Sequence, residues 1–343
     1  MIQNVHLSNA AAQAKAPMRR IGRFTITDKL GSGSNGNVML GHDPVIDRPV
    51  AIKILNNPNG ANDKKQREQQ FINEARAAGR LSHPNIVTIY DASTEGGTTF
   101  IAMEFLQGKD LRELMSNGKR FDVIEAASIA YKVANALAFA HNQGVIHRDI
   151  KPANIFLVEN NQPKVVDFGI ARVPNRTLDE NGQPQTLFKN NIMGTPNYMS
   201  PEQASSQPVT ALTDVYSLGA TLYEMLTNQK PFSASDFDKL LYNIARKTPK
   251  SPDLINPDVP EKLAHIVMKA MQKKPHRRYK SAAEMALALN KFLAKEKRDR
   301  RKTGSSNVIR KTTSEIGEKS TLFWLGWSSF IIASILVVLA FQK

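Results

Sequence analysis

The pattern of hydrophobic and polar positions changes its character along the chain. Residues 21–106 carry short runs rich in β-branched and aromatic residues, punctuated by Gly and Asp, which is typical of strands. One helical pattern interrupts them, around residues 64–81. The strand-like runs are RFTITDKL, NVMLGHD, VAIKIL, IVTIYDAS and FIAMEFL.

Helical periodicity dominates after residue 110. The apolar repeat at 123–144 ends on Asn142–Gly144, which is a typical helix stop. The same spacing returns in three later segments: DVYSLGATLYEMLTNQKPF, EKLAHIVMKAMQKKP and SAAEMALALNKFLAKE.

The two patterns together predict an α+β protein of two lobes. A small β-rich lobe with one key helix takes up residues 21–106, and a larger helical lobe takes up 107–295. The hinge between them is expected near residues 104–108. A flexible arm, 1–20, precedes the domain, and it has no apolar core long enough for a signal peptide.

The last part of the chain predicts a membrane anchor. Residues 322–341 carry no charge, and sixteen of these twenty residues are apolar. At about 1.5 Å per residue, such a helix spans a hydrocarbon core of roughly 30 Å. Trp324 and Trp327 lie at one end, where indole rings favour the headgroup layer. A buried C-terminal helix is the alternative. Because only Gln342 and Lys343 follow, we expect no sensor domain beyond the span.

Charge is concentrated in the flanks. The chain has a net charge of +15, of which residues 291–311 contribute +7 and the N-terminal arm +3. The basic linker, 296–321, lies beside the predicted span, so it should keep the domain on the cytoplasmic side of a single-pass inner-membrane protein and attract anionic lipid. Binding of nucleic acid by the basic residues of 291–311 is the alternative, and we do not expect it.

The chain has no cysteine, which excludes disulfides, thiolate metal sites and cysteine nucleophiles.

The first candidate chemistry is a nucleotide site in the β-rich lobe. Gly31, Gly33 and Gly36 are flanked by strand patterns on both sides, which favours a glycine-rich hairpin over phosphates rather than a strand-to-helix turn. Lys53 lies within an apolar strand and needs a partner if it is buried. Glu74 lies on the apolar face of the predicted helix, so we expect a Lys53–Glu74 ion pair that directs the ammonium to phosphate oxygens.

The second candidate is a cluster of charge between apolar residues in VIHRDIKPANIFLV, residues 145–158. Asp149 could accept or orient a hydroxyl proton, and Lys151 could neutralise a transferring phosphoryl group. Asn154 and the later Asp167 offer the oxygen ligands that Mg²⁺ prefers. Phosphoryl transfer needs mainly positioning and charge neutralisation, so this residue set indicates that reaction.

At this point the chain resembles the eukaryotic-like protein kinases. GSGSNGNV, VAIK, Glu74, HRDIKPAN, DFG, GTPNYMSPE and DVYSLG occur in the order and spacing of that family over residues 21–295. HRDIKPANI and SPEQ are similar to the Ser/Thr branch found in bacteria, whose members are often membrane-anchored. One departure is Ser200, where the family usually has alanine.

The resemblance implies the role of each matching residue. Asp149 would be the catalytic base, Lys151 the phosphate contact, and Asn154 and Asp167 the ligands of Mg²⁺, for which Mn²⁺ could substitute. Glu202 and Arg278 should form a buried ion pair, and Asp214 should brace the catalytic loop, HRDIKPAN at residues 147–154. The expected ATP contacts are Gly31, Gly33, Gly36, Val38, Ala51, Lys53, Met103, Glu104, Leu106, Asn154, Phe156 and Asp167.

Control is expected in the segment from Asp167 to Glu202, which shows little apolar periodicity. Arg148 needs an anion, and a phosphothreonine could supply one. Thr177 and Thr186 are the candidates, with Thr186 preferred, although both could be solvated loop residues. The resemblance places Thr195 beside Asp149 and Lys151, which favours Ser/Thr over Tyr as the phosphate acceptor.

The predicted function is therefore a membrane-tethered Ser/Thr protein kinase that acts on protein substrates and activates itself by autophosphorylation. A homodimer would allow the reaction in trans. A pseudokinase scaffold is the main alternative, and the presence of Lys53, Asp149 and Asp167 argues against it. A small-molecule phosphotransferase of related fold is a minor one, because it would lack the GTPNYMSPE segment.

Overall fold

The chain separates into two units, residues 1–289 and 290–343. The first contains a β-rich lobe followed by a larger helical lobe, as the sequence predicts. In the second unit, residues 290–300 are helical. The computed structural model describes residues 20–33, 36–55, 61–168, 176–178, 184–186 and 196–300.

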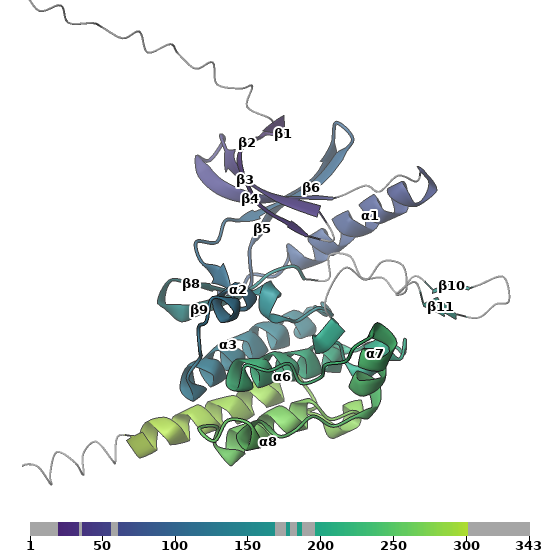
Figure 1. Cartoon of the computed structure of the whole chain (residues 1–343). Helices are drawn as coiled ribbons and strands as arrows, with labels where there is room; N and C mark the ends of the chain where they lie inside the picture. Colours follow the sequence, from purple (N-terminus) through teal and green to yellow (C-terminus); the bar gives the residue numbers. More distant parts are fainter. Residues whose placement is uncertain are drawn as a thin grey trace, which may run out of the picture. The chain divides into compact units, whose positions relative to one another are not determined.

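Six antiparallel strands form the sheet of the N-terminal lobe, in the order β1-β2-β3-β4-β6-β5 (Figure 1). The five predicted strand runs correspond to β2 through β6. Phe24 and Ile26 alternate inward from β2 and pack with Val50 and Ile52 of β4 in one core cluster. The strands are β1 Arg20–Ile21, β2 Phe24–Gly33, β3 Gly36–Asp43, β4 Arg48–Leu55, β5 Ile89–Glu95 and β6 Thr98–Glu104.

Helix α1, Ala61–Ala78, packs against β5 and β6 of this sheet. Its residues Phe71 and Ala75 are buried against Ile101. The helix was predicted at 64–81, and it lies three residues closer to the N-terminus at both ends. The contact with Ile101 determines which side of α1 is turned to the sheet, and Glu74 lies next to that side.

Helix α6, Ala211–Thr227, is the centre of the helical lobe. Fourteen of its seventeen residues are buried, so it is surrounded by protein on all sides. Helices α3 and α8 pack on it (Figure 1). Within the described residues, α3 alone is long and apolar enough to cross a membrane, but it is half buried in this core. Further helices are α2 Leu111–Ser116, α3 Val123–Asn142, α5 Pro201–Ala204, α7 Phe237–Arg246 and α8 Glu261–Ala270.

A three-stranded sheet, β7-β8-β9, lies in the helical lobe and carries much of the candidate chemistry. The segment with Asp149 leads into β8, and Asp167 comes two residues after β9. The periodicity predicted a largely helical lobe and missed most of this sheet, because its strands are only two to four residues long. The strands are β7 Lys109–Asp110, β8 Ile155–Val158 and β9 Gln162–Val165. Short 3₁₀ turns are η1 Pro152–Asn154, η2 Glu159–Asn161, η3 Pro196–Tyr198, η4 Pro252–Leu254 and η5 Pro275–Arg277.

Candidate functional site

The glycine-rich segment forms the antiparallel β2–β3 hairpin, as predicted, and does not open a helix. Gly36 has φ of +146°, and a Cβ there would come 1.8 Å from the carbonyl oxygen of Ile54. Glycine is therefore required where β3 closes on β4. Gly31 has no such constraint, since no heavy atom lies within 4 Å of a Cβ built there. Gly33 pairs with Gly36 across the hairpin.

Four of the predicted ATP contacts lie in one apolar cluster. Ala51 of β4 and Met103 of β6 pack with Val38 of β3 and with Leu106, which follows β6. Val166 of the helical lobe packs on the same cluster. The cluster thus joins the two lobes close to Glu104, where the chain passes from the β-rich lobe to the helical lobe. Phe156 lies on β8, opposite Lys164 on β9.

Glu104 at this crossing is fixed by its side chain, which the sequence did not predict. Lys164 Nζ lies 2.7 Å from Glu104 Oε1 and 2.8 Å from Oε2. The backbone N–H of Thr88 also donates to Oε2, at 3.2 Å. Because β9 and β6 belong to different lobes, this ion pair holds the crossing in place.

The ion-pair partner of Lys53 differs from the prediction. Lys53 Nζ lies 2.7 Å from Asp167 Oδ1, whereas Glu74 accepts a hydrogen bond from the Gln70 amide at 3.0 Å. The Lys53 side chain is 6% exposed, so its ammonium needs a close countercharge. Asp167 supplies it from a left-handed backbone conformation with φ of +60°. The strand and helix patterns could not predict this choice, because it depends on how α1 sits on the sheet.

The charge of Lys53 also determines the protonation state of the Asp167 carboxyl. Burial would raise the pKa of the Asp167 carboxyl, but the charge and hydrogen bond of Lys53 outweigh it. The pKa therefore lies below its usual range, and Asp167 is a carboxylate at neutral pH.

Asp149, Lys151 and Asn154 are in direct contact. Lys151 Nζ lies 2.7 Å from Asp149 Oδ2. The Asn154 amide nitrogen donates to the backbone oxygen of Asp149 at 2.8 Å and to Oδ2 at 3.2 Å. The proposed base, the proposed phosphate contact and a proposed metal ligand therefore form one group, as their spacing predicted.

His147 connects this group to the segment of Asp167, a role that the sequence did not predict. Its Nε2–H donates to the backbone oxygen of Val166 at 2.8 Å, and its Nδ1 accepts from the backbone N–H of Asp149 at 3.2 Å. These two contacts require the neutral Nε2–H tautomer. The ring also lies 4.7 Å from that of Phe168. His147 thus fixes the backbones next to both carboxylates.

Asp214 braces the catalytic loop from below, which confirms the prediction. This fully buried residue on α6 accepts hydrogen bonds from the backbone N–H groups of His147 at 2.8 Å and Arg148 at 2.7 Å. His141 Nε2 donates to it as well, at 2.8 Å. Arg148 has φ of +67°, a strained conformation for this residue, and these bonds hold it there.

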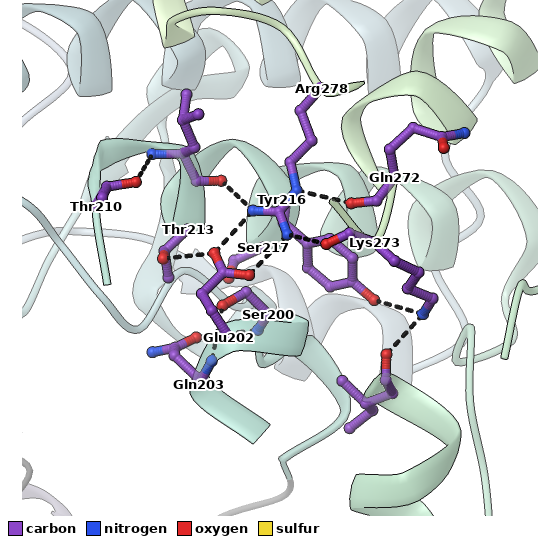
Figure 2. Close-up of polar contacts among 12 residues, drawn as sticks. Ser200, Glu202, Gln203, Thr210, Thr213, Tyr216, Ser217, Gln272, Lys273 and Arg278 are labelled. Carbon is purple, nitrogen blue, oxygen red and sulfur yellow. Dashed lines mark hydrogen bonds and ion pairs between the residues drawn. The ribbon is translucent and has the colours of Figure 1, made fainter. Parts of the chain in front are cut away.

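The predicted Glu202–Arg278 ion pair is also confirmed (Figure 2). Two parallel hydrogen bonds of 2.8 and 2.7 Å join the guanidinium to the carboxylate, and Thr213 adds a third to Glu202. The other three N–H groups of Arg278 donate to backbone oxygens at 2.7, 2.9 and 3.1 Å. All five donors are therefore used, which a buried arginine requires. The oxygens belong to Gln272, Leu212 and Lys273.

The described residues contain no group of three or more His, Asp or Glu side chains that could hold a metal ion. The residues expected to bind Mg²⁺ are a carboxylate, Asp167, and an amide, Asn154. The Asn154 nitrogen is turned to Asp149, so the amide oxygen is the atom left for a cation. Two hard oxygen donors fit Mg²⁺ if phosphate and water complete its shell.

The predicted regulatory residues are only partly described. Thr177 lies on β10, Arg176–Leu178, and Thr186 on β11, Pro184–Thr186, which pair antiparallel. The low apolar periodicity of this segment gave no sign of these two short strands. Among the described residues, the buried Nε of Arg148 has no hydrogen-bond partner. Thr195 lies outside the described residues.

The comparisons with known proteins place this geometry in a family. Residues 24–292 match the model of the protein kinase domain. Relatives include the serine/threonine-protein kinase PrkC of Bacillus subtilis, 37% identical over 265 residues, and PknB of Mycolicibacterium smegmatis, 38% identical over 273 residues. These alignments cover 77% and 78% of this chain but 39% and 43% of the relatives, so the chain spans about four-tenths of their length.

Solved structures agree with this match. The crystal structure of the Mycobacterium tuberculosis PknI kinase domain is 27% identical and has a TM-score of 0.64. The match covers 81% of this chain and 99% of that one.

Proposed function

Because this chain belongs to the protein kinase family, we propose that it transfers the γ-phosphoryl group of ATP to Ser and Thr hydroxyls of proteins. The observation that carries the proposal is the contact of Asp149 with Lys151 and Asn154, beside the Lys53–Asp167 pair. The relatives named above are serine/threonine-protein kinases, which supports the choice of acceptor.

Each residue has one task in this proposal. Asp149 accepts or orients the proton of the attacking hydroxyl, and Lys151 neutralises charge on the moving phosphoryl group. Lys53 contacts the α- and β-phosphates. Protein kinases use ATP with a divalent cation, and we assign Mg²⁺ to Asn154 and Asp167, where it would neutralise phosphate charge. Mn²⁺ has the same ligand preference and would also fit.

The direct test is phosphoryl transfer by the full chain. Incubation with labelled ATP and Mg²⁺ should transfer phosphate to the chain itself and to an added basic protein, and acid hydrolysis should release phosphoserine or phosphothreonine. Phosphate only on tyrosine would contradict the acceptor assignment. ATP binding without any transfer would favour the pseudokinase alternative.

Autophosphorylation should also control this enzyme. The Arg148 guanidinium has a buried Nε that lacks a hydrogen-bond partner within the described residues, which supports an incoming anion. A phosphothreonine brings about −1.5 to −2 charge at pH 7 and three acceptor oxygens. The strands β10 and β11 place Thr177 opposite Gln185 and Thr186 opposite Arg176. We assign the phosphate to Thr186, with Thr177 as second choice.

Replacing both threonines by Ala should lower activity toward an added substrate by about tenfold or more, since phosphate ordering of activation loops controls such enzymes. Phosphosite mapping should find phosphate within residues 170–194 of the wild-type chain. Wild-type activity in the double variant, or phosphate only outside this segment, would contradict the mechanism. Thr248→Ala, at an exposed position of the helical lobe, is the matched control.

We also propose that residues 322–341, which lie outside the described residues, anchor the enzyme in the cytoplasmic membrane. The full chain should sediment with membranes and resist carbonate extraction, while a chain shortened to residues 1–295 should be soluble. The basic linker predicts a cytoplasmic domain, so external protease should leave the domain intact in whole cells. Cleavage of the domain by external protease would contradict this orientation.

The proposed partners are protein substrates, ATP and membrane lipid, and a homodimer that phosphorylates in trans is consistent with autophosphorylation. We do not expect residues 291–311 to bind nucleic acid. A salt titration that compares binding of the full chain to anionic vesicles and to DNA separates the two: vesicle binding should dominate.

A further inference from the structure

The side-chain amide of one residue links the start of α5 to the catalytic loop. Gln203 is the third residue of α5, and its Oε1 accepts from the backbone N–H of Ser200 at 3.0 Å. Ser200 Oγ accepts from the backbone N–H of Gln203 at 3.3 Å, which completes a capping box at the start of the helix. The Nε2 of the same Gln203 donates to the backbone oxygen of Arg148 at 2.8 Å.

The contact with Arg148 lies one residue before the proposed base. The peptide group between Arg148 and Asp149 is hydrogen-bonded at both ends. Its oxygen accepts from Gln203 Nε2, and its N–H donates to His147 Nδ1. The N–H of Arg148 itself is held by Asp214. Since the backbone of Arg148 is in a left-handed conformation, it would relax without such bonds. The orientation of this peptide determines where the Asp149 carboxylate points.

A contact that does not involve Gln203 also holds α5 in place. The preceding residue, Glu202, anchors the helix through its ion pair with Arg278 and its hydrogen bond with Thr213 (Figure 2). The side chain of Gln203 is only partly buried. A change at Gln203 should therefore alter the catalytic loop more than the stability of the fold.

We propose that Gln203 is a positioning residue, which sets the orientation of Asp149 through the carbonyl of Arg148. Ser200 assists by fixing the Gln203 backbone, which gives a structural reason for serine at a position where the resemblance expects alanine. The inference rests on the proposed kinase function. It predicts that residues 196–200 and the catalytic loop are coupled through one side-chain amide.

The test compares Gln203→Ala, Gln203→Glu and the wild type in the full chain. Loss of the Nε2 donor leaves the Arg148 carbonyl without this bond, so kcat should fall about tenfold in both variants at pH 7.5. KM for ATP should change less than twofold, because the apolar cluster and Lys53 lie elsewhere. Gln207→Glu, an exposed glutamine four residues later, is the matched control for charge and should keep kcat.

A pH profile separates positioning from a general structural effect. In the Gln203→Glu variant, protonation of the new carboxylate would restore an O–H donor for the Arg148 oxygen, whereas alanine cannot supply one. The ratio of kcat for Gln203→Glu to that of the wild type should therefore rise at least about threefold from pH 7.5 to 5.5. The same ratio for Gln203→Ala should stay constant.

Three results would overturn the proposal: wild-type kcat in both variants, equal pH profiles in both variants, or a fall of kcat accompanied by a midpoint of thermal unfolding lowered by more than about 5 °C. The last would show a structural role. These results differ from failure of the proposed function, in which the wild-type chain itself would transfer no phosphate.

Discussion

Asp149→Asn should lower phosphoryl transfer by about two to four orders of magnitude, the range that a positioned general base contributes. Asparagine has nearly the same shape, but its amide cannot take the proton of an attacking hydroxyl. It also removes the negative charge from the contact with Lys151, now 2.7 Å. ATP affinity should stay within a few-fold of wild type, because Lys53 and Asp167 are unchanged. Initial rates with a protein substrate and titration with a fluorescent ATP analogue measure the two quantities.

A matched variant makes this result specific. Asp258→Asn makes the same chemical change at an exposed position of the helical lobe and should leave the rate unchanged. If Asp149→Asn kept more than a tenth of the wild-type rate, Asp149 would not be the base. If ATP binding disappeared with the rate, the residue would serve binding rather than proton transfer.

The sequence predicted best those features that depend on local pattern. The N-terminal sheet follows from alternating residues such as Phe24 and Ile26, since strand periodicity directly determines which face is buried. The Glu202–Arg278 pair and the Asp214 brace came from the resemblance, because 76 and 67 residues separate the partners along the chain.

Choices between neighbouring partners could not be predicted. Lys53 has two carboxylates to pair with, Glu74 and Asp167, and the structure pairs it with Asp167. Which of the two carboxylates pairs with Lys53 depends on the position of α1 on the sheet. No pattern of residue types specifies that position. The short strands β10 and β11 were not predicted for another reason: their sequences show almost no alternation of apolar and polar residues.

The contacts of Gln203 were predictable only in part. Ser200 and Gln203 have the spacing of a capping box, so a local pattern was present in the sequence. The second bond of the same amide goes to Arg148, 55 residues earlier, and only the fold brings the two together.

Arg278→Met should give the largest loss of stability among the substitutions considered. It removes five hydrogen bonds and leaves the carboxylate of Glu202 buried without its countercharge. Breaking a buried ion pair in this way costs about 3–5 kcal/mol of the free energy of unfolding. Urea unfolding of the full chain should show it. Arg277→Met, at the exposed neighbouring position, should change the midpoint little.

The loss should depend on pH in a defined direction. In the wild type, burial alone would raise the pKa of Glu202, but Arg278 and Thr213 hold it below its usual range. The pair therefore contributes its full stability above the ordinary pKa of about 4.3, and this contribution is lost as the pH falls through the lowered value. In Arg278→Met, burial dominates and raises the pKa, so Glu202 is neutralised already at mildly acidic pH. The stability gap between the two proteins should be largest near pH 7 and narrow towards pH 4. A difference that stayed the same from pH 7 to pH 4 would show that the loss comes from the three backbone contacts of Arg278, which do not titrate, rather than from the buried charge.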